Sequence, residues 1–177
     1  MEVLLGGFEA ILLLACFIAA VWDFLYWEIP NEIILFLIAL YILKLALVGG
    51  FAHALTPLLF ALGTLVVGFV LFYFKALGPG DSKLIAVCAL WFAPHLFWEF
   101  LLAMACVGGL LALAYHLAYV YINALRAWVA QVLTNILVHI PFVGVKEVPA
   151  PPMREQAMIP YGIAIFCGAL AVHFIET

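Results

Sequence analysis

The chain has 177 residues, of which 70% are hydrophobic and 9% charged, and its net charge is −4. A soluble domain carries about 25% charged residues and could not cover so much apolar surface, so this composition excludes a water-soluble globular fold. It also excludes intrinsic disorder. The small negative charge gives no electrostatic basis for binding nucleic acid. The sequence therefore predicts a membrane protein that has the lipid bilayer, and no nucleic acid, as a partner.

Long apolar runs follow one another along the chain, separated by proline and glycine. They cover Val3–Tyr26, Glu32–Val48, Ala52–Phe74, Ser82–Pro94, Phe97–Ile122 and Pro160–Ile175. Because a membrane helix needs about 20 residues, the second and fourth runs are short, although protein can shield such an end from lipid. The runs predict an all-α, polytopic membrane protein with six transmembrane helices.

The basic residues predict the orientation of these helices. If the N-terminus lies outside, five of the six Lys and Arg residues fall on the cytoplasmic side, namely Lys75, Lys83, Arg126, Lys146 and Arg154. Cytoplasmic loops carry an excess of such residues. We therefore expect both the N-terminus and the C-terminus to lie outside.

The segment from about 123 to 140 differs from the other apolar runs. Its apolar residues recur at helical spacing, while Arg126, Gln131 and Asn135 lie mostly on the opposite face. This pattern predicts an amphipathic helix in the cytoplasmic interface before the last span; a seventh span is the weaker alternative. A proline-rich cytoplasmic loop is expected at about 141–159.

The chain has two aspartates, Asp23 and Asp81, and the predicted topology places both at the cytoplasmic face. An ionisable group near hydrocarbon is costly and is typical of a functional site. Each has an ordinary alternative: Asp81 could cap the next helix, and Asp23 could reach interfacial water. Neither alternative explains why both lie at one face. Two facing carboxyl groups share a proton and can activate water for peptide cleavage.

The neighbouring residues fit such a site. Gly78 and Gly80 lack a Cβ, so the backbone there can pass close to a substrate strand, and Pro79 stiffens the turn between them. Lys83 would add positive charge near Asp81, or would reach the interface as a lysine commonly does. Pro30 and Asn31 open the second predicted helix.

These motifs, in this order, resemble the prepilin peptidases. They are Asp23 followed by Ile29-Pro30-Asn31, then Gly78-Pro79-Gly80-Asp81-Ser82-Lys83, then Pro160-Tyr161-Gly162. Prepilin peptidases are type IV leader peptidases of the GxGD aspartic protease family. This chain resembles the short form that serves tight-adherence (Flp) pili.

The resemblance implies an aspartic endopeptidase with Asp23 and Asp81 as its catalytic residues. It would remove the basic leader of type IV pilin-like precursors after a glycine, at the cytoplasmic face of the bacterial inner membrane. Residues 1–177 would form a single membrane peptidase domain without a metal or cofactor. Larger members carry a cysteine-rich insert and also methylate the product; this chain lacks the insert, so we expect no methyltransferase activity.

Relatives often carry basic residues after the first aspartate, where this chain has Phe24-Leu25-Tyr26-Trp27-Glu28, a stretch typical of an aromatic interface belt. The resemblance suggests that Glu28 and Glu32 attract the positive leader. The alternative is that both are solvated acids at the start of a helix.

Other functions have less support. A non-enzymatic transporter or pilus-assembly subunit could use the two aspartates as ion ligands. A serine protease would need Ser82, whose neighbour Lys83 points elsewhere on a helix. No HExxH motif supports a zinc protease, and the four cysteines are scattered.

The sequence also predicts two contacts between helices. The spacing Ala164-x-x-x-Gly168 predicts close helix packing in the last span. Glu9 and Lys44 fall at similar depths in the first two helices, so we expect them to approach each other, because an unpaired charge there is costly.

Overall fold

The computed structural model describes residues 2–48, 54–137, 149 and 159–176. These residues form helices and no strand, as the composition predicts. The helices are α1 (Glu2–Tyr26), α2 (Asn31–Val48), α3 (Leu55–Tyr73), α4 (Pro79–Trp91), α5 (Pro94–Leu137) and α6 (Tyr161–Glu176). The all-helical prediction is therefore confirmed for the described part of the chain.

Four helices, α1, α2, α3 and α5, are long and apolar enough to cross a membrane. Their outer faces expose many large apolar side chains, such as Val67 of α3 and Leu102 of α5. Soluble monomers rarely expose so much contiguous apolar surface, so the chain is a multi-pass membrane protein. The two remaining helices, α4 and α6, have 13 and 16 residues, fewer than the about 20 that a span needs. Six spans therefore stay a prediction.

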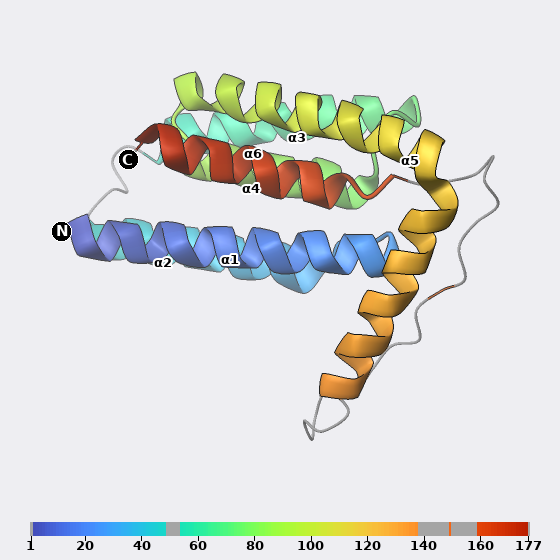
Figure 1. The fold of residues 1–177 in the computed structure, drawn as a ribbon. Coiled ribbons are helices and arrows are strands. Elements are labelled where there is room, and N and C mark those ends of the chain that lie inside the picture. The colour runs from blue at the N-terminus through green and yellow to red at the C-terminus, as the bar shows by residue number, and fades with distance from the viewer. Residues whose placement is uncertain (1, 49–53, 138–148, 150–158, 177) are drawn as a thin grey trace.

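The helices form three layers of two (Figure 1). α1 and α2 make one outer layer, α3 and α5 make the other, and α4 and α6 lie between them. The central position explains why the short helices are tolerated: protein, and not lipid, surrounds most of α4, where Leu84, Cys88 and Ala89 are fully buried. The N-terminus and the C-terminus lie at one end of the bundle.

α5 bends at Ala118, which has non-helical backbone angles (φ −123°, ψ 29°). Beyond this residue the helix leaves the direction of the bundle and runs across its end (Figure 1). The segment predicted as a separate helix from about residue 123 is helical as far as Leu137, but it belongs to α5, and the change of direction lies at Ala118. Its position in the membrane interface stays a prediction. Residues 138–140 and nearly all of the predicted loop at 141–159 lie outside the described residues.

The small residues of α6 pack as the sequence predicts. Ala164 is fully buried, and a Cβ added to Gly168 would lie 2.9 Å from both the ring and the carbonyl oxygen of Phe100 in α5. The absence of a side chain at Gly168 therefore sets how closely α5 and α6 approach.

Glu9 and Lys44 have other partners than the expected ones. The Glu9 carboxylate lies 3.5 Å from Nδ1 of His173 in α6, and Nζ of Lys44 lies 5.1 Å from the centre of the Trp91 ring in α4. The expected pairing is wrong because each charge contacts the central layer instead, Glu9 at α6 and Lys44 at α4.

Replacing Gly168 by valine should lower the free energy of unfolding by about 1–3 kcal/mol, because the added side chain would overpack against the Phe100 backbone. Chemical unfolding in detergent micelles measures this loss. Gly109→Val in α5 is the matched control, since a Cβ at Gly109 has nothing within 4 Å. Equal stability of the two variants would contradict the predicted contact.

Candidate active site

A small polar pocket lies where the α1–α2 turn meets the start of α4, and its volume is about 230 Å³. It contains both aspartates. Its lining residues are Asp23, Trp27, Glu28, Ile29, Asn31, Gly78, Pro79, Gly80, Asp81 and Lys83. We call it the acid pocket. The structure thus brings together most of the residues singled out in the sequence, from segments more than 50 positions apart.

Asp23 lies in the last turn of α1 and is only 5% exposed. Its Oδ2 accepts a hydrogen bond of 2.7 Å from the backbone N–H of Gly162, in the first turn of α6. A Cβ at Gly162 would lie 2.9 Å from the Asp23 Cβ and 3.2 Å from the Ala20 Cα, so only glycine allows this approach. The first turn of α6 therefore fixes the position of the Asp23 carboxyl group.

Asp81 is the third residue of α4 and is 8% exposed. Its Oδ2 accepts a hydrogen bond of 3.2 Å from the N–H of Gly78, the residue before the helix. A Cβ at Gly78 would lie 2.6 Å from that oxygen, so a side chain there would push the carboxylate away. Asp81 therefore stabilises the helix start and faces the acid pocket at the same time.

The position of Asp81 has an electrostatic consequence. It lies outside the four helices that are long enough to span the membrane. Burial raises the pKa of Asp81 to about 6, and the hydrogen bond from Gly78 opposes this rise. The two carboxyl groups are close enough for the charge of Asp81 to act on Asp23. This pocket can therefore hold a proton and a negative charge together near neutral pH.

Gly80 allows the two halves of the acid pocket to meet. A Cβ at Gly80 would lie 3.1 Å from the Ile29 Cβ and 3.3 Å from the Ile29 backbone nitrogen. The sequence predicts that the two glycines allow a substrate strand to pass close to the backbone. The structure gives both a packing role: Gly78 accommodates the Asp81 carboxylate, and Gly80 accommodates the α1–α2 turn.

The remaining predicted residues divide into two groups. Lys83 and Asn31 join α4 to α2, because Nζ of Lys83 donates a hydrogen bond of 2.9 Å to Oδ1 of Asn31. Glu28 is exposed and lines the acid pocket. Glu32 lines a different, apolar hollow between α1 and α2. Pro30 lies in the same turn, but it is not among the residues that line the acid pocket.

Trp27 and Arg126 form an unexpected contact beside the acid pocket. Cζ of Arg126 lies 3.4 Å from the centre of the Trp27 ring, and its guanidinium donates to the Leu25 carbonyl at the end of α1. Arg126 also donates to the Pro149 carbonyl, at 2.9 Å. Trp27 has a positive φ of 55°, which is strained for a bulky side chain, so this stack stabilises an otherwise unfavourable turn.

The structure differs from the sequence prediction at Arg126. Arg126 was assigned to the polar face of an interfacial helix, but it is 2% exposed. Trp27, which the sequence predicts to belong to an aromatic interface belt, also lines the acid pocket. The signal for Arg126 is that a lone cation among apolar residues needs a partner. Gly162 was part of a quoted motif, and nothing in its spacing indicates that it contacts Asp23.

Metal ligands do not gather in the described part of the chain, where no three His, Cys, Asp or Glu side chains come together to hold an ion. The polar side-chain groups of the residues that line the acid pocket are three carboxylates, one amide, one ammonium and the indole N–H of Trp27. These groups suit proton transfer and binding of a peptide backbone.

Replacing Arg126 by alanine should lower the free energy of unfolding by about 2 kcal/mol, because the Leu25 and Pro149 carbonyls lose their donor and the Trp27 turn loses its support. Chemical unfolding in detergent micelles measures the change. Lys75→Ala is the control, because Lys75 is an exposed cation and its loss should cost less than about 0.5 kcal/mol. Equal losses in the two variants would show that the Arg126 contacts contribute no stability.

Comparison with known proteins agrees with this geometry. The model of the type IV leader peptidase family matches residues 10–117, a range that includes both aspartates and Gly78–Lys83. No curated protein and no solved structure matches the chain. Because the family model covers more than half of the sequence, the chain belongs to the type IV leader peptidase family, whose members are proteases.

Proposed function

We propose that this protein is an aspartic endopeptidase in which Asp23 and Asp81 together cleave the leader from type IV pilin-like precursors. The observation that carries the proposal is the acid pocket, where two nearly buried carboxyl groups from distant helices line one small cavity. Each carboxyl group is held by one backbone N–H, from Gly162 or from Gly78. Such support fixes the carboxyl groups in place and leaves further oxygen atoms for water and substrate.

In the proposed reaction the two carboxyl groups act as a unit that holds one proton. The ionised member takes a proton from a water molecule, whose oxygen attacks the scissile carbonyl carbon. The protonated member donates a hydrogen bond to the carbonyl oxygen. When the C–N bond breaks, the leaving nitrogen takes the proton that the first carboxyl group received from water and becomes an amine, so the pair again holds one proton. A pKa of about 6 for Asp81 supports this scheme, because a carboxyl group with such a pKa retains part of its proton near neutral pH.

The proposed orientation places the acid pocket at the cytoplasmic face of the inner membrane, with both chain ends outside. The end of the bundle that contains the acid pocket carries three basic residues, Lys75, Lys83 and Arg126. Lys44 lies toward the other end of α2. This distribution agrees with the excess of basic residues in cytoplasmic loops. Both chain ends lie at one end of the bundle, which agrees with an even number of crossings (Figure 1). In this proposal α4 and α6 complete the six-helix domain inside the four longer helices.

The proposed substrate is the basic leader of the precursor, cleaved after a glycine. Glu28 lies at the rim of the acid pocket, where its negative charge would attract a positive leader. Glu32 faces the hollow between α1 and α2. The structure therefore favours Glu28 over Glu32 as the residue that the leader meets.

Asp23→Asn and Asp81→Asn should each lower the rate of leader removal at least 100-fold, because an amide cannot transfer the proton that the reaction requires. Leader loss is measured by mass after co-expression with candidate pilin precursors. Glu99→Gln is the control, since Glu99 is an exposed acid of α5. Processing that survives either aspartate variant would rule out the proposed mechanism and leave a transporter or assembly subunit as the alternative.

Glu28→Lys should slow processing of a basic leader about tenfold, chiefly through a higher KM, while Glu32→Lys should change it less than twofold. Steady-state cleavage of the precursor at low and high salt measures both effects, and salt should reduce the difference. A larger effect at Glu32 would move the leader site away from the acid pocket.

A further inference from the structure

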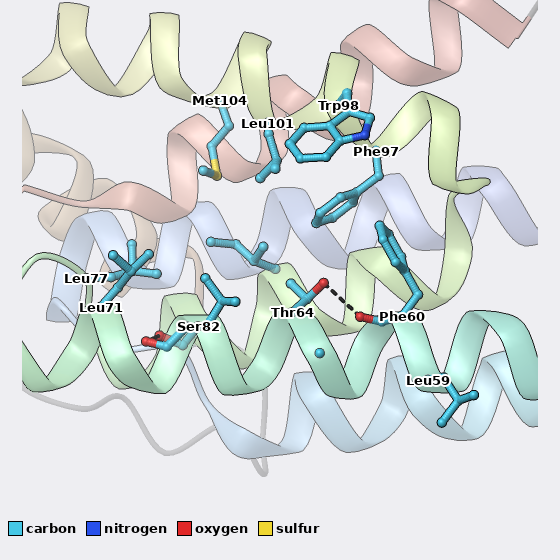
Figure 2. Close-up of a pocket in the computed structure, with 14 residues that line it drawn as sticks. Leu59, Phe60, Thr64, Leu71, Leu77, Ser82, Phe97, Trp98, Leu101 and Met104 are labelled. Carbon is cyan, nitrogen blue, oxygen red and sulfur yellow. Dashed lines mark hydrogen bonds between the residues drawn. The ribbon is translucent and has the colours of Figure 1, made fainter.

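The two aspartates are supported in different ways, and Asp81 is supported by its neighbour Ser82. The Ser82 side chain is 2% exposed, and its Oγ lies 3.1 Å from the Gly68 carbonyl oxygen of α3 and 2.9 Å from the Gly78 carbonyl oxygen. Figure 2 shows Ser82 among the apolar side chains, such as Leu71, that line the cavity beside α3. Contacts with α3 therefore fix the start of α4, where Asp81 lies.

Asp23 lies at the other kind of position, in the last turn of a helix. The last four carbonyl groups of a helix have no N–H partner within the regular helix. The Asp23 carbonyl accepts a hydrogen bond of 2.8 Å from the Trp27 N–H. The Leu25 carbonyl accepts from the Arg126 guanidinium, whose Nε lies 3.0 Å away. Arg126 thus caps the end of α1, where a positive charge is also favoured by the helix dipole.

The same guanidinium fixes the residue that follows α1. Cζ of Arg126 lies 3.4 Å from the centre of the Trp27 ring, and Trp27 has the strained positive φ of 55°. Trp27 holds the Asp23 carbonyl through its backbone N–H and lines the acid pocket through its side chain. A change in the position of Arg126 would therefore reach both the backbone of Asp23 and one wall of the pocket.

Arg126 acts from a helix that carries neither aspartate. The bend at Ala118 directs the second part of α5 across the end of the bundle (Figure 1), where Arg126 also donates to the Pro149 carbonyl at 2.9 Å. Its side chain is 2% exposed, and a buried charge is costly unless it is hydrogen-bonded. Among the described residues, its hydrogen-bond partners are backbone carbonyls and not a carboxylate. Arg126 therefore holds backbone in place and does not neutralise Asp23.

We propose that Arg126 is a positioning residue for Asp23: by capping α1 and stacking on Trp27, it holds the Asp23 carboxyl group beside Asp81 in the acid pocket. This inference rests on the proposed function and adds a residue outside the pocket on which the reaction depends. Misplacing a reacting group by about 1 Å can lower a rate about 100-fold. Substrate binding should depend little on Arg126, because Arg126 does not line the acid pocket.

Arg126→Lys tests the proposal, because lysine keeps the positive charge but lacks the planar guanidinium that donates twice to one carbonyl and stacks on a ring. The kcat for leader removal should fall at least tenfold and KM should change less than twofold, at a temperature where the variant is fully folded. Lys75→Ala removes an exposed cation and is the control, with both constants unchanged. An unchanged kcat in Arg126→Lys, or a rise of KM alone, would overturn the proposal.

The presence of only two aspartates in the chain allows a second measurement that requires no cleavage. Labelling of aspartate with ¹³C at the carboxyl carbon gives two NMR signals, and Asp81→Asn identifies that of Asp23. Arg126→Lys should shift or broaden the Asp23 signal more than the Asp81 signal, whereas Lys75→Ala should change neither. Trp27→Leu removes the ring of the same stack and should have the same effect, so it replaces Arg126→Lys if that variant does not fold.

The outcomes separate this proposal from the proposed function. An Asp23 signal that stays unchanged, or equal changes of both aspartate signals, would overturn the positioning role. Loss of cleavage in Asp81→Asn without an effect of Arg126→Lys would reject the positioning role alone. Full cleavage by Asp81→Asn would reject the proposed function itself.

Discussion

The contact between Ile29 and Gly80 joins the two halves of the acid pocket. α1 carries Asp23 and α4 carries Asp81, and neither helix alone brings its carboxyl group to the other. The α1–α2 turn can approach the start of α4 only because Gly80 has no side chain, since a Cβ there would lie 3.1 Å from the Ile29 Cβ. The hydrogen bond between Lys83 and Asn31 joins the same two segments one turn further along. The two carboxyl groups can therefore line one pocket only because the backbone of the α1–α2 turn approaches the start of α4 so closely.

The helix lengths agree with this constraint. α4 has 13 residues, and its first turn must lie where α1 ends. Surrounding α4 with longer helices avoids the cost of exposing its ends to lipid. α6 is also a short helix between the longer ones, and its first turn supplies the Gly162 N–H that donates to Asp23. The first turns of the two central helices therefore carry Asp81 and hold Asp23.

The sequence predicted local features better than contacts between distant segments. Apolar length predicted the helices, and the paired aspartates with their glycines predicted the acid pocket, because composition and motif carry that information directly. Sequence did not indicate that Arg126 would reach Trp27, since this contact depends on the bend at Ala118. It also paired Glu9 with Lys44, whereas Glu9 lies beside His173 and Lys44 beside Trp91 of the central layer. Such choices depend on how the layers stack, which no single segment specifies.

The loop before α4 contains two kinds of position with different freedom to vary. Gly78 and Gly80 each have protein atoms where a side chain would stand, whereas the Pro79 side chain between them is exposed. Proline suits the first position of a helix, and other residues are accepted there as well. In related sequences we therefore expect both glycines to be retained and the residue between them to vary. Packing alone would produce this pattern, even without selection for catalysis.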